Sequence, residues 1–147
     1  MMRFLARLLR RFGGSASPAD LPSVVQSSEP LTRFIFSSDH FAATKGVVKA
    51  RAFLPDKSGE TSVFRIEALS NEEIWRIGNG IRPEQAKARG DIAANAVYGT
   101  GLSIHPATAD HPRHAVIVGW PAEKDKKLML ATLLSQYAVL RLAEVAG

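Results

Sequence analysis

The stretch Ala115-Val-Ile-Val-Gly-Trp120 is a continuous apolar run, and Pro121 follows it directly. A run of this kind is typical of a strand that is buried on both faces, so we expect a central strand here. After Pro121, apolar residues recur at helical spacing as far as about Val145, which predicts one long helix lying across the sheet. The broad apolar side of this helix consists of Leu130, Leu133, Leu134, Tyr137, Ala138 and Leu140.

Extended segments come before this strand and helix. Residues 32–36 are rich in aromatic and β-branched residues, and residues 47–53 and 61–66 alternate in side-chain character. The sequence Pro55-Asp-Lys-Ser-Gly59, between the last two segments, is a strong turn signal. We therefore expect residues 47–53 and 61–66 to form an antiparallel hairpin.

The expected hairpin would gather cations on one face. With the turn centred near Lys57, Lys49 lies opposite Arg65, and Arg51 lies opposite Val63. Like charges directly opposite one another destabilise a sheet, so this register implies either solvated side chains or an anion bound between them. A solvated outer face is the preferred interpretation, because Lys and Arg are common on the wet side of a sheet.

Short helices are expected between these strands and the central strand. Ser70-Asn-Glu-Glu73 has the spacing of a capping box, and Gly78-Asn-Gly80 ends the helix after about two turns. A second helix is predicted from Pro83 to Arg89. Residues 92–98 and 102–105 flank a Gly-Thr-Gly turn and favour another hairpin, although the alanines of the first segment leave a helix open. Strands followed by a long closing helix indicate an α+β fold with a mostly antiparallel sheet of about four to six strands.

The chain of 147 residues is long enough for one hydrophobic core. Residues 15–30 contain three prolines and five serines without sustained periodicity, which is typical of a linker. We therefore expect a basic amphipathic helix over residues 1–14, a linker over residues 15–30 and one α+β domain over residues 31–147.

Most of the net charge of +5 comes from residues 1–14, which contain four arginines and no acidic residue. Residues 15–147 carry 15 Lys and Arg against 14 Asp and Glu, so the predicted domain is nearly neutral. On a helix the first fourteen residues separate into two sides, with Arg3, Arg7, Arg10 and Arg11 on one and Phe4, Leu8 and Phe12 on the other. This segment can bind an anionic membrane or a groove of a partner protein. Packing on its own domain and an organellar presequence remain open.

Side chains capable of acid–base chemistry concentrate between His105 and His114, and His40 is the one histidine outside this segment. Two histidines can cleave a phosphodiester without a metal, one accepting and one donating a proton. We therefore take His40 and His114 as candidate catalytic residues, with Arg65 stabilising phosphate charge. The candidate anion-binding or nucleic-acid-binding residues are Lys49, Arg51, Arg65 and Arg113.

The same histidine-rich segment offers a weaker metal alternative, with His105, Asp110, His111 and His114 as donors. The spacing of His111 and His114 is not that of a recognised zinc site, so metal binding is disfavoured. The sequence shows no Ser-His-Asp context for a nucleophilic serine and no complete nucleotide-binding glycine motif. It contains no cysteine, which excludes disulfides and thiolate catalysis. No cofactor is expected.

These observations favour a non-catalytic adaptor or accessory subunit, which residues 1–14 attach to a protein partner or an anionic membrane. We expect this protein in the cytoplasm or at the periphery of a membrane, with organellar import left open. The alternative is a small metal-independent phosphodiesterase, nuclease or nucleic-acid-binding protein. Nucleic acid is the less favoured partner, because nucleic-acid-binding domains usually carry an excess of basic residues.

Overall fold

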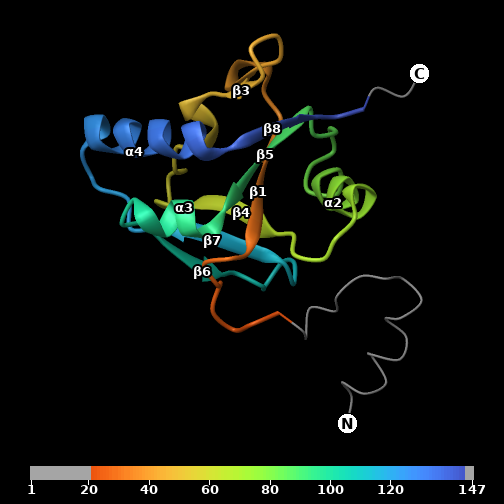
Figure 1. The fold of residues 1–147 in the computed structure, drawn as a ribbon, viewed down its shortest axis with the longest axis horizontal. Coiled ribbons are helices and arrows are strands. Elements are labelled where there is room, and N and C mark those ends of the chain that lie inside the picture. The colour runs from red at the N-terminus through yellow and green to blue at the C-terminus, as the bar shows by residue number, and fades with distance from the viewer. Residues whose placement is uncertain (1–20, 145–147) are drawn as a thin grey trace.

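An antiparallel sheet of six strands forms the centre of the computed structural model, which describes residues 21–144 (Figure 1). The strands are β1 (Pro30–Ile35), β4 (Thr61–Arg65), β5 (Ala88–Ala93), β6 (Ser103–Pro106), β7 (His114–Val118) and β8 (Val139–Leu142). Their order across the sheet is β6-β7-β4-β1-β5-β8. The predicted α+β fold with a mostly antiparallel sheet is confirmed. The predicted basic helix over residues 1–14 lies outside the described residues.

Within residues 21–144, three α-helices accompany the sheet, namely α2 (Asn71–Gly78), α3 (Ala94–Gly99) and α4 (Lys124–Tyr137). A two-stranded ladder, β2 (Phe41–Ala42) with β3 (Val47–Val48), lies between two short 3₁₀ helices, η2 (Ser38–His40) and η3 (Ala50–Phe53). None of the helices in residues 21–144 combines the length and the apolar character needed to cross a bilayer.

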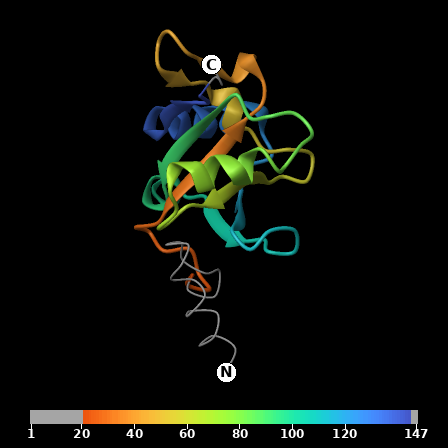
Figure 2. The same ribbon diagram turned by 90° about the vertical axis from the view of Figure 1, so that its right-hand side faces the viewer.

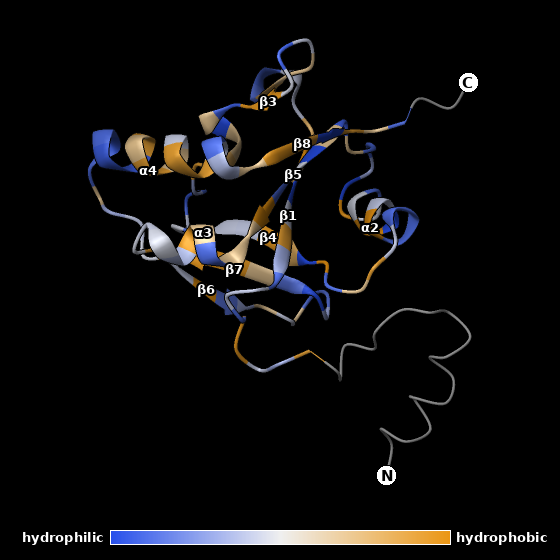
Figure 3. Cartoon of the chain, in the orientation of Figure 1, coloured by the Kyte–Doolittle hydropathy of each residue, from blue (hydrophilic) through white to orange (hydrophobic). Residues whose placement is uncertain are grey.

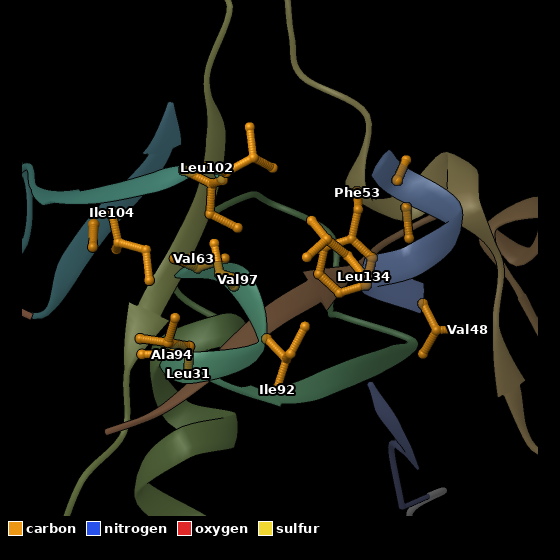
Figure 4. Close-up of a cluster of buried hydrophobic side chains, with 14 of the residues drawn as sticks. Leu31, Val48, Phe53, Val63, Ile92, Ala94, Val97, Leu102, Ile104 and Leu134 are labelled. Atoms are coloured by element: carbon orange, nitrogen blue, oxygen red, sulfur yellow. The ribbon is translucent and has the colours of Figure 1, made fainter. Parts of the chain in front are cut away.

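The larger part of the hydrophobic core lies on the side of the sheet where α3, α4 and η3 pack (Figures 1 and 2). Phe53 of η3 and Leu134 of α4 are fully buried and lie next to each other in this core, as Figure 4 shows. Ala115 and Ile117 of β7 are also fully buried, and β7 is flanked by β6 and β4. The run from Ala115 to Trp120 therefore contains an inner strand, as predicted.

A smaller apolar cluster lies beneath α2 and includes Phe34, Phe64 and Ile74. The predicted capping box is present at the start of this helix, since Ser70 Oγ accepts from Glu73 N and Glu73 Oε1 accepts from Ser70 N. At the other end of the helix, a Cβ on Gly78 would overlap the ring of Phe34. The glycine therefore permits the close approach of α2 to β1.

The predicted hairpin between residues 47–53 and 61–66 is wrong. Residues 50–53 form η3, and β4 pairs instead with β1 and β7. Ala52 and Phe53 are consecutive residues and both are fully buried, which a strand with one wet face does not allow. Arg33 of β1 also holds the turn of η3, because its Nε donates to Ala52 O at 2.8 Å.

Two helix predictions also need correction. Residues 83–87 form turns and coil, and β5 begins at Ala88, so the helix predicted from Pro83 to Arg89 is absent. The helix predicted to reach Val145 ends at Tyr137 as α4, and the chain continues as β8. As β8, residues 139–142 pair with β5 and add a sixth strand to the sheet, a long-range contact that helical periodicity does not reveal.

Of residues 92–98, the first two belong to β5, which ends at Ala93, and the others belong to α3, which begins at Ala94. The helical alternative is therefore correct for most of this segment. The partner of β6 is therefore β7. The described part of the predicted linker is packed, since Val25 and Glu29 are buried and Tyr98 Oη donates to Val25 O at 2.7 Å. The folded part thus begins before Leu31.

Candidate functional site

Two adjoining cavities lie where β1, β4 and the loop after α2 meet, and we call them together the Arg33 cleft. They share Arg33, Phe34, Phe36 and Arg82 in their walls. The first cavity, of about 230 Å³, is also lined by Ser62, Phe64, His114, Asp110, Asp56, Glu60 and Ile81. The second, of about 270 Å³, is also lined by Ser37, His40 and Glu84. The two candidate catalytic histidines therefore line neighbouring cavities.

His114 reaches the cleft because of the pairing of β4 with β7. Phe64 pairs with His114 in the register, so Ser62 lies diagonally beside His114 on the same face of the sheet. His114 Nε2 lies 3.1 Å from Ser62 Oγ. His114 Nδ1 lies 3.0 Å from both Ala107 O and Asp110 Oδ1. Both groups near Nδ1 are acceptors, so a neutral His114 carries its proton on Nδ1. Its Nε2 then accepts a hydrogen bond from the Ser62 hydroxyl.

The chain Asp110–His114–Ser62 has the order of a Ser-His-Asp triad, which the sequence did not reveal. Asp110 is 69% exposed and shares Nδ1 with a backbone carbonyl. Ser62 lies within β4, opposite Val116 of β7, and not on an exposed turn. A nucleophilic serine acts from an exposed position beside donors for an oxyanion. The arrangement therefore suits binding through hydrogen bonds better than acyl transfer.

Arg33 is the deepest charge in the cleft. Its Nε donates to Ala52 O at 2.8 Å, and its Nη1 donates to Ser62 O at 2.9 Å. Burial lowers the pKa of Arg33 to about 10, and repulsion by Arg82 adds to this effect. The guanidinium remains charged at neutral pH. No carboxylate of residues 21–144 forms an ion pair with it.

Arg82 supplies the second cation and lies near the entrance. Its guanidinium carbon is 4.5 Å from the centroid of the Phe36 ring, a distance suited to a cation–π contact. Its Nη1 is 3.9 Å from Glu84 Oε1, and both side chains are more than half exposed. Such a long and exposed ion pair contributes little energy, so Arg82 is available for other anions.

His40 lies at the end of η2, beside the second cavity. Burial lowers the pKa of His40, and the positive charges of Arg51 and Arg33 lower it further. The ring is therefore neutral at physiological pH and can accept a proton.

The structure does not bring Arg65 to the cleft. Its Nε lies 2.7 Å from Glu29 Oε1 and its Nη2 lies 2.6 Å from Glu29 Oε2, and the two side chains are only 3% and 5% exposed. Arg113 is likewise buried, and its Nη1 donates to the carbonyl oxygens of Arg65 and Glu67. Both arginines are engaged inside the protein.

The other predicted groups do not form one site either. Lys49 and Arg51 are exposed around the start of η3 and do not share a face with the buried Arg65. In the described part of the chain, no three His, Cys, Asp or Glu side chains are grouped so that they could hold a metal ion. The metal alternative with His105, Asp110, His111 and His114 is therefore not supported.

The polar cleft residues that sequence reasoning missed include Arg33, Ser62 and Arg82. Arg33 stands alone between apolar residues in Leu31-Thr-Arg-Phe-Ile35, and a lone cation in a buried strand was a usable signal. Ser62 gave no signal, because its neighbour His114 is 52 positions away.

Comparison of the sequence with protein-family models, with curated proteins and with solved structures gives no match. The geometry of the chain itself is therefore the basis for the functional proposals below.

Proposed function

We propose that this protein is a non-catalytic adaptor or accessory subunit that binds another protein through α4 and β8. The observation that supports this proposal is the position of the exposed apolar side chains. Seven of the nine large hydrophobic residues that are exposed in residues 21–144 lie on α4, β8 or the adjoining β3. Large exposed apolar patches commonly mark sites of protein–protein interaction.

The apolar residues on α4 form a stripe. Met129, Leu133 and Tyr137 are spaced four residues apart, so they lie along one side of the helix, and they are 59%, 37% and 62% exposed. The predicted apolar side of this helix therefore faces the core only in part. Leu134 is buried, whereas Leu133 and Tyr137 are open to solvent.

The stripe leads into β8, which is an edge strand. β8 pairs with β5 on one side, and no strand of the described residues pairs with its other side. Val139 and Leu142 of β8 are 52% and 47% exposed, and Figure 3 shows apolar residues on both α4 and β8. An open edge can accept a strand from another chain. The partner that fits is a protein segment that extends the sheet and covers the stripe with apolar side chains.

The basic segment of residues 1–14 completes this proposal as an attachment to a protein partner or an anionic membrane. Its separation of arginines from apolar residues supports the proposal. Co-sedimentation of the full chain and of a form starting at Ser15 with anionic phosphatidylserine vesicles tests the membrane version. Equal and negligible binding of both forms would contradict it.

Substitution of Leu133 tests the α4–β8 surface. A Leu133→Glu variant should lose a stoichiometric partner that co-purifies with the full chain. A Thr132→Glu variant, which places the same charge at an exposed position about 100° around α4 from Leu133, should retain it. In the reconstituted pair, the affinity should fall by at least about tenfold for Leu133→Glu, because a charge is then placed against apolar surface. Equal affinities of both variants would refute the assignment of this surface.

A metal-independent phosphodiesterase or nuclease remains the second candidate. The observation that favours it is that His40 and His114 line neighbouring cavities with Arg33 and Arg82 between them. Hydrolysis of a phosphodiester substrate in the presence of a chelator, compared between the full chain and His114→Ala, tests this candidate. Turnover that is absent or unchanged in the variant would contradict it.

A further inference from the structure

Holding the charge of Arg33 away from bulk water costs free energy. A buried ion normally requires a counter-ion and complete hydrogen bonding. Two carbonyl oxygens, of Ala52 and Ser62, satisfy Nε and Nη1 of Arg33, but they carry no full negative charge. The ion pairs within residues 21–144 do not include Arg33. Arg33 therefore lacks a carboxylate within ion-pair distance in the described residues, although Asp56, Glu60 and Asp110 line the same cavity.

The hydrogen bonds of Nε and Nη1 fix the direction of Nη2, the third nitrogen of the Arg33 side chain. Bonds from Nε and Nη1 fix the plane of the guanidinium, and Nη2 has no hydrogen-bond partner in the described chain. In that part of the chain, Arg89 Nη1 is the only fully buried side-chain nitrogen or oxygen without a partner. Nη2 of Arg33 is therefore open to the cleft, where it can donate to a ligand.

Two further donor groups, of Arg82 and Ser62, border the same space, and His114 lies beside Ser62. Arg82 is held over Phe36 at the junction of the two cavities. Ser62 and His114 line the first cavity from β4 and β7. The Ser62 hydroxyl, which lies 3.1 Å from His114 Nε2, can turn towards an acceptor in the cavity. Donors that approach from several directions suit a tetrahedral oxyanion better than a planar carboxylate.

Four carboxylates also line the Arg33 cleft, namely those of Asp56, Glu60 and Asp110 in the first cavity and Glu84 in the second. Asp56 is exposed, and its Oδ1 accepts from Ser58 N, Ser58 Oγ and Glu60 N within its own turn. Asp110 is 69% exposed and contacts His114. Solvent screens these charges, so the carboxylates offset the charge of Arg33 only in part, and Asp56 raises the pKa of Arg33 against the effect of burial. The remaining repulsion acts on every phosphate that approaches, so a single compact phosphate is less disfavoured here than the extended phosphate backbone of a nucleic acid.

The lining residues and volumes of the two cavities indicate what the remainder of the ligand is. Phe34, Phe36 and Phe64 are among the residues that line the first cavity. Each cavity, of about 230 or 270 Å³, is smaller than a typical small-molecule site of about 300 Å³ or more, so a ligand would have to occupy both. A ligand of the size of a mononucleotide, with one phosphate and a flat or apolar remainder, fits these dimensions.

We propose that the Arg33 cleft is a binding site for a small phosphorylated molecule, with the phosphate held by Arg33 Nη2, Arg82 and the Ser62–His114 pair. The apolar part of the ligand lies against the phenylalanine rings. This site is separate from the α4–β8 surface, so the proposal stands independently of the adaptor function. Leu133→Glu should leave it intact.

Calorimetric titration of the full chain tests the proposal, with inorganic phosphate, adenosine monophosphate and malonate as probes. Both phosphates should bind saturably, adenosine monophosphate more tightly and with a Kd of about 1 mM or lower. Malonate, which carries planar carboxylates, should bind at least about tenfold more weakly. No saturable binding of either phosphate, or tighter binding of malonate, would overturn the proposal.

Two exposed arginines provide a matched pair of variants. Arg82→Gln should weaken the binding of adenosine monophosphate by at least about tenfold, because one charged donor is lost. Arg76→Gln removes an exposed arginine of α2 that does not line the cleft, and it should leave the affinity unchanged. Ser62→Ala should weaken binding by a smaller factor, and ligand-induced NMR shifts of the full chain should include the ring of His114. Equal affinities of Arg82→Gln and Arg76→Gln would refute the assignment. Tighter binding of a single-stranded RNA oligomer than of adenosine monophosphate would refute the small-ligand proposal.

Discussion

Removal of one partner of the Glu29–Arg65 ion pair should destabilise the protein strongly. Both side chains are at least 95% buried, and two short charge-assisted bonds of 2.7 and 2.6 Å join them. Glu29 Oε2 also accepts from Gln26 N at 2.8 Å, and Arg65 Nη2 donates to Pro22 O at 2.8 Å. Arg65→Met leaves a buried carboxylate without its counter-ion, and we expect a loss of about 3–5 kcal/mol in the free energy of unfolding.

The double variant Glu29→Leu/Arg65→Met should be much less destabilised than the two single variants added together. Each single variant leaves one buried charge uncompensated, whereas the double variant leaves none. The two changes should therefore be non-additive by at least about 2 kcal/mol. Urea unfolding followed by tryptophan fluorescence measures these differences, provided that the slope of the transition is unchanged.

The pH dependence gives an independent check on this ion pair. Burial alone would raise the pKa of Glu29, but hydrogen bonds from Arg65 and from the backbone of Gln26 outweigh burial and lower it. A carboxylate with a lowered pKa stabilises the folded state above its ordinary pKa of 4.5, and this contribution is lost as pH falls through the lowered value. Glu29→Gln should remove that part of the acid sensitivity. A cost below about 1 kcal/mol for Arg65→Met, or simple additivity, would refute the reasoning.

Three other changes test particular contacts of the fold. Gly78→Ala should destabilise the protein by about 1–3 kcal/mol in thermal or urea unfolding, although alanine favours helices, because its Cβ would overlap the Phe34 ring. A second change, Phe34→Leu, should recover part of this loss, and a stabilised Gly78→Ala protein would contradict the packing. Ser70→Ala should cost about 1 kcal/mol through loss of the cap of α2, with the exposed Ser58→Ala as a control that costs less. Burial lowers the pKa values of His40 and His111 below their ordinary value of 6.5, so the folded protein favours their neutral forms. Stability should therefore be fully present above that value and decrease as pH falls below it, and His111→Gln should reduce this slope in unfolding curves measured at a series of pH values. Stability that is independent of pH across this window would show that folding does not lower the pKa values of these two rings.

Elements with strong local signals could be predicted from the sequence. The capping box at Ser70 and the apolar run after His114 depend on residues only a few positions apart, and both appear in the structure. Residues 47–53 had an equally clear alternation, but Ala52 and Phe53 are both buried against α4 and adopt a 3₁₀ turn. Tertiary packing therefore overrode the local pattern at η3.

The candidate site shows the same contrast between local sequence signals and contacts that only the tertiary structure decides. Its histidines could be identified as chemically capable, but the residues that surround them could not. Arg65 looked like a free cation and is paired with Glu29, 36 positions away. Arg33 looked like an ordinary strand residue and is the deepest charge of the cleft, held by Ala52 and Ser62.

By itself, the sequence determined the fold class, the inner strand β7 and the start and end of α2. Each of these follows from side-chain periodicity and capping, which act between near neighbours on the chain. Only the tertiary structure decided that β4 lies between β1 and β7, that the chain after α4 returns to the sheet as β8, and that Ser62 meets His114. Strand pairing and the neutralisation of buried charge depend on groups many residues apart, and local sequence patterns do not encode which of those groups meet.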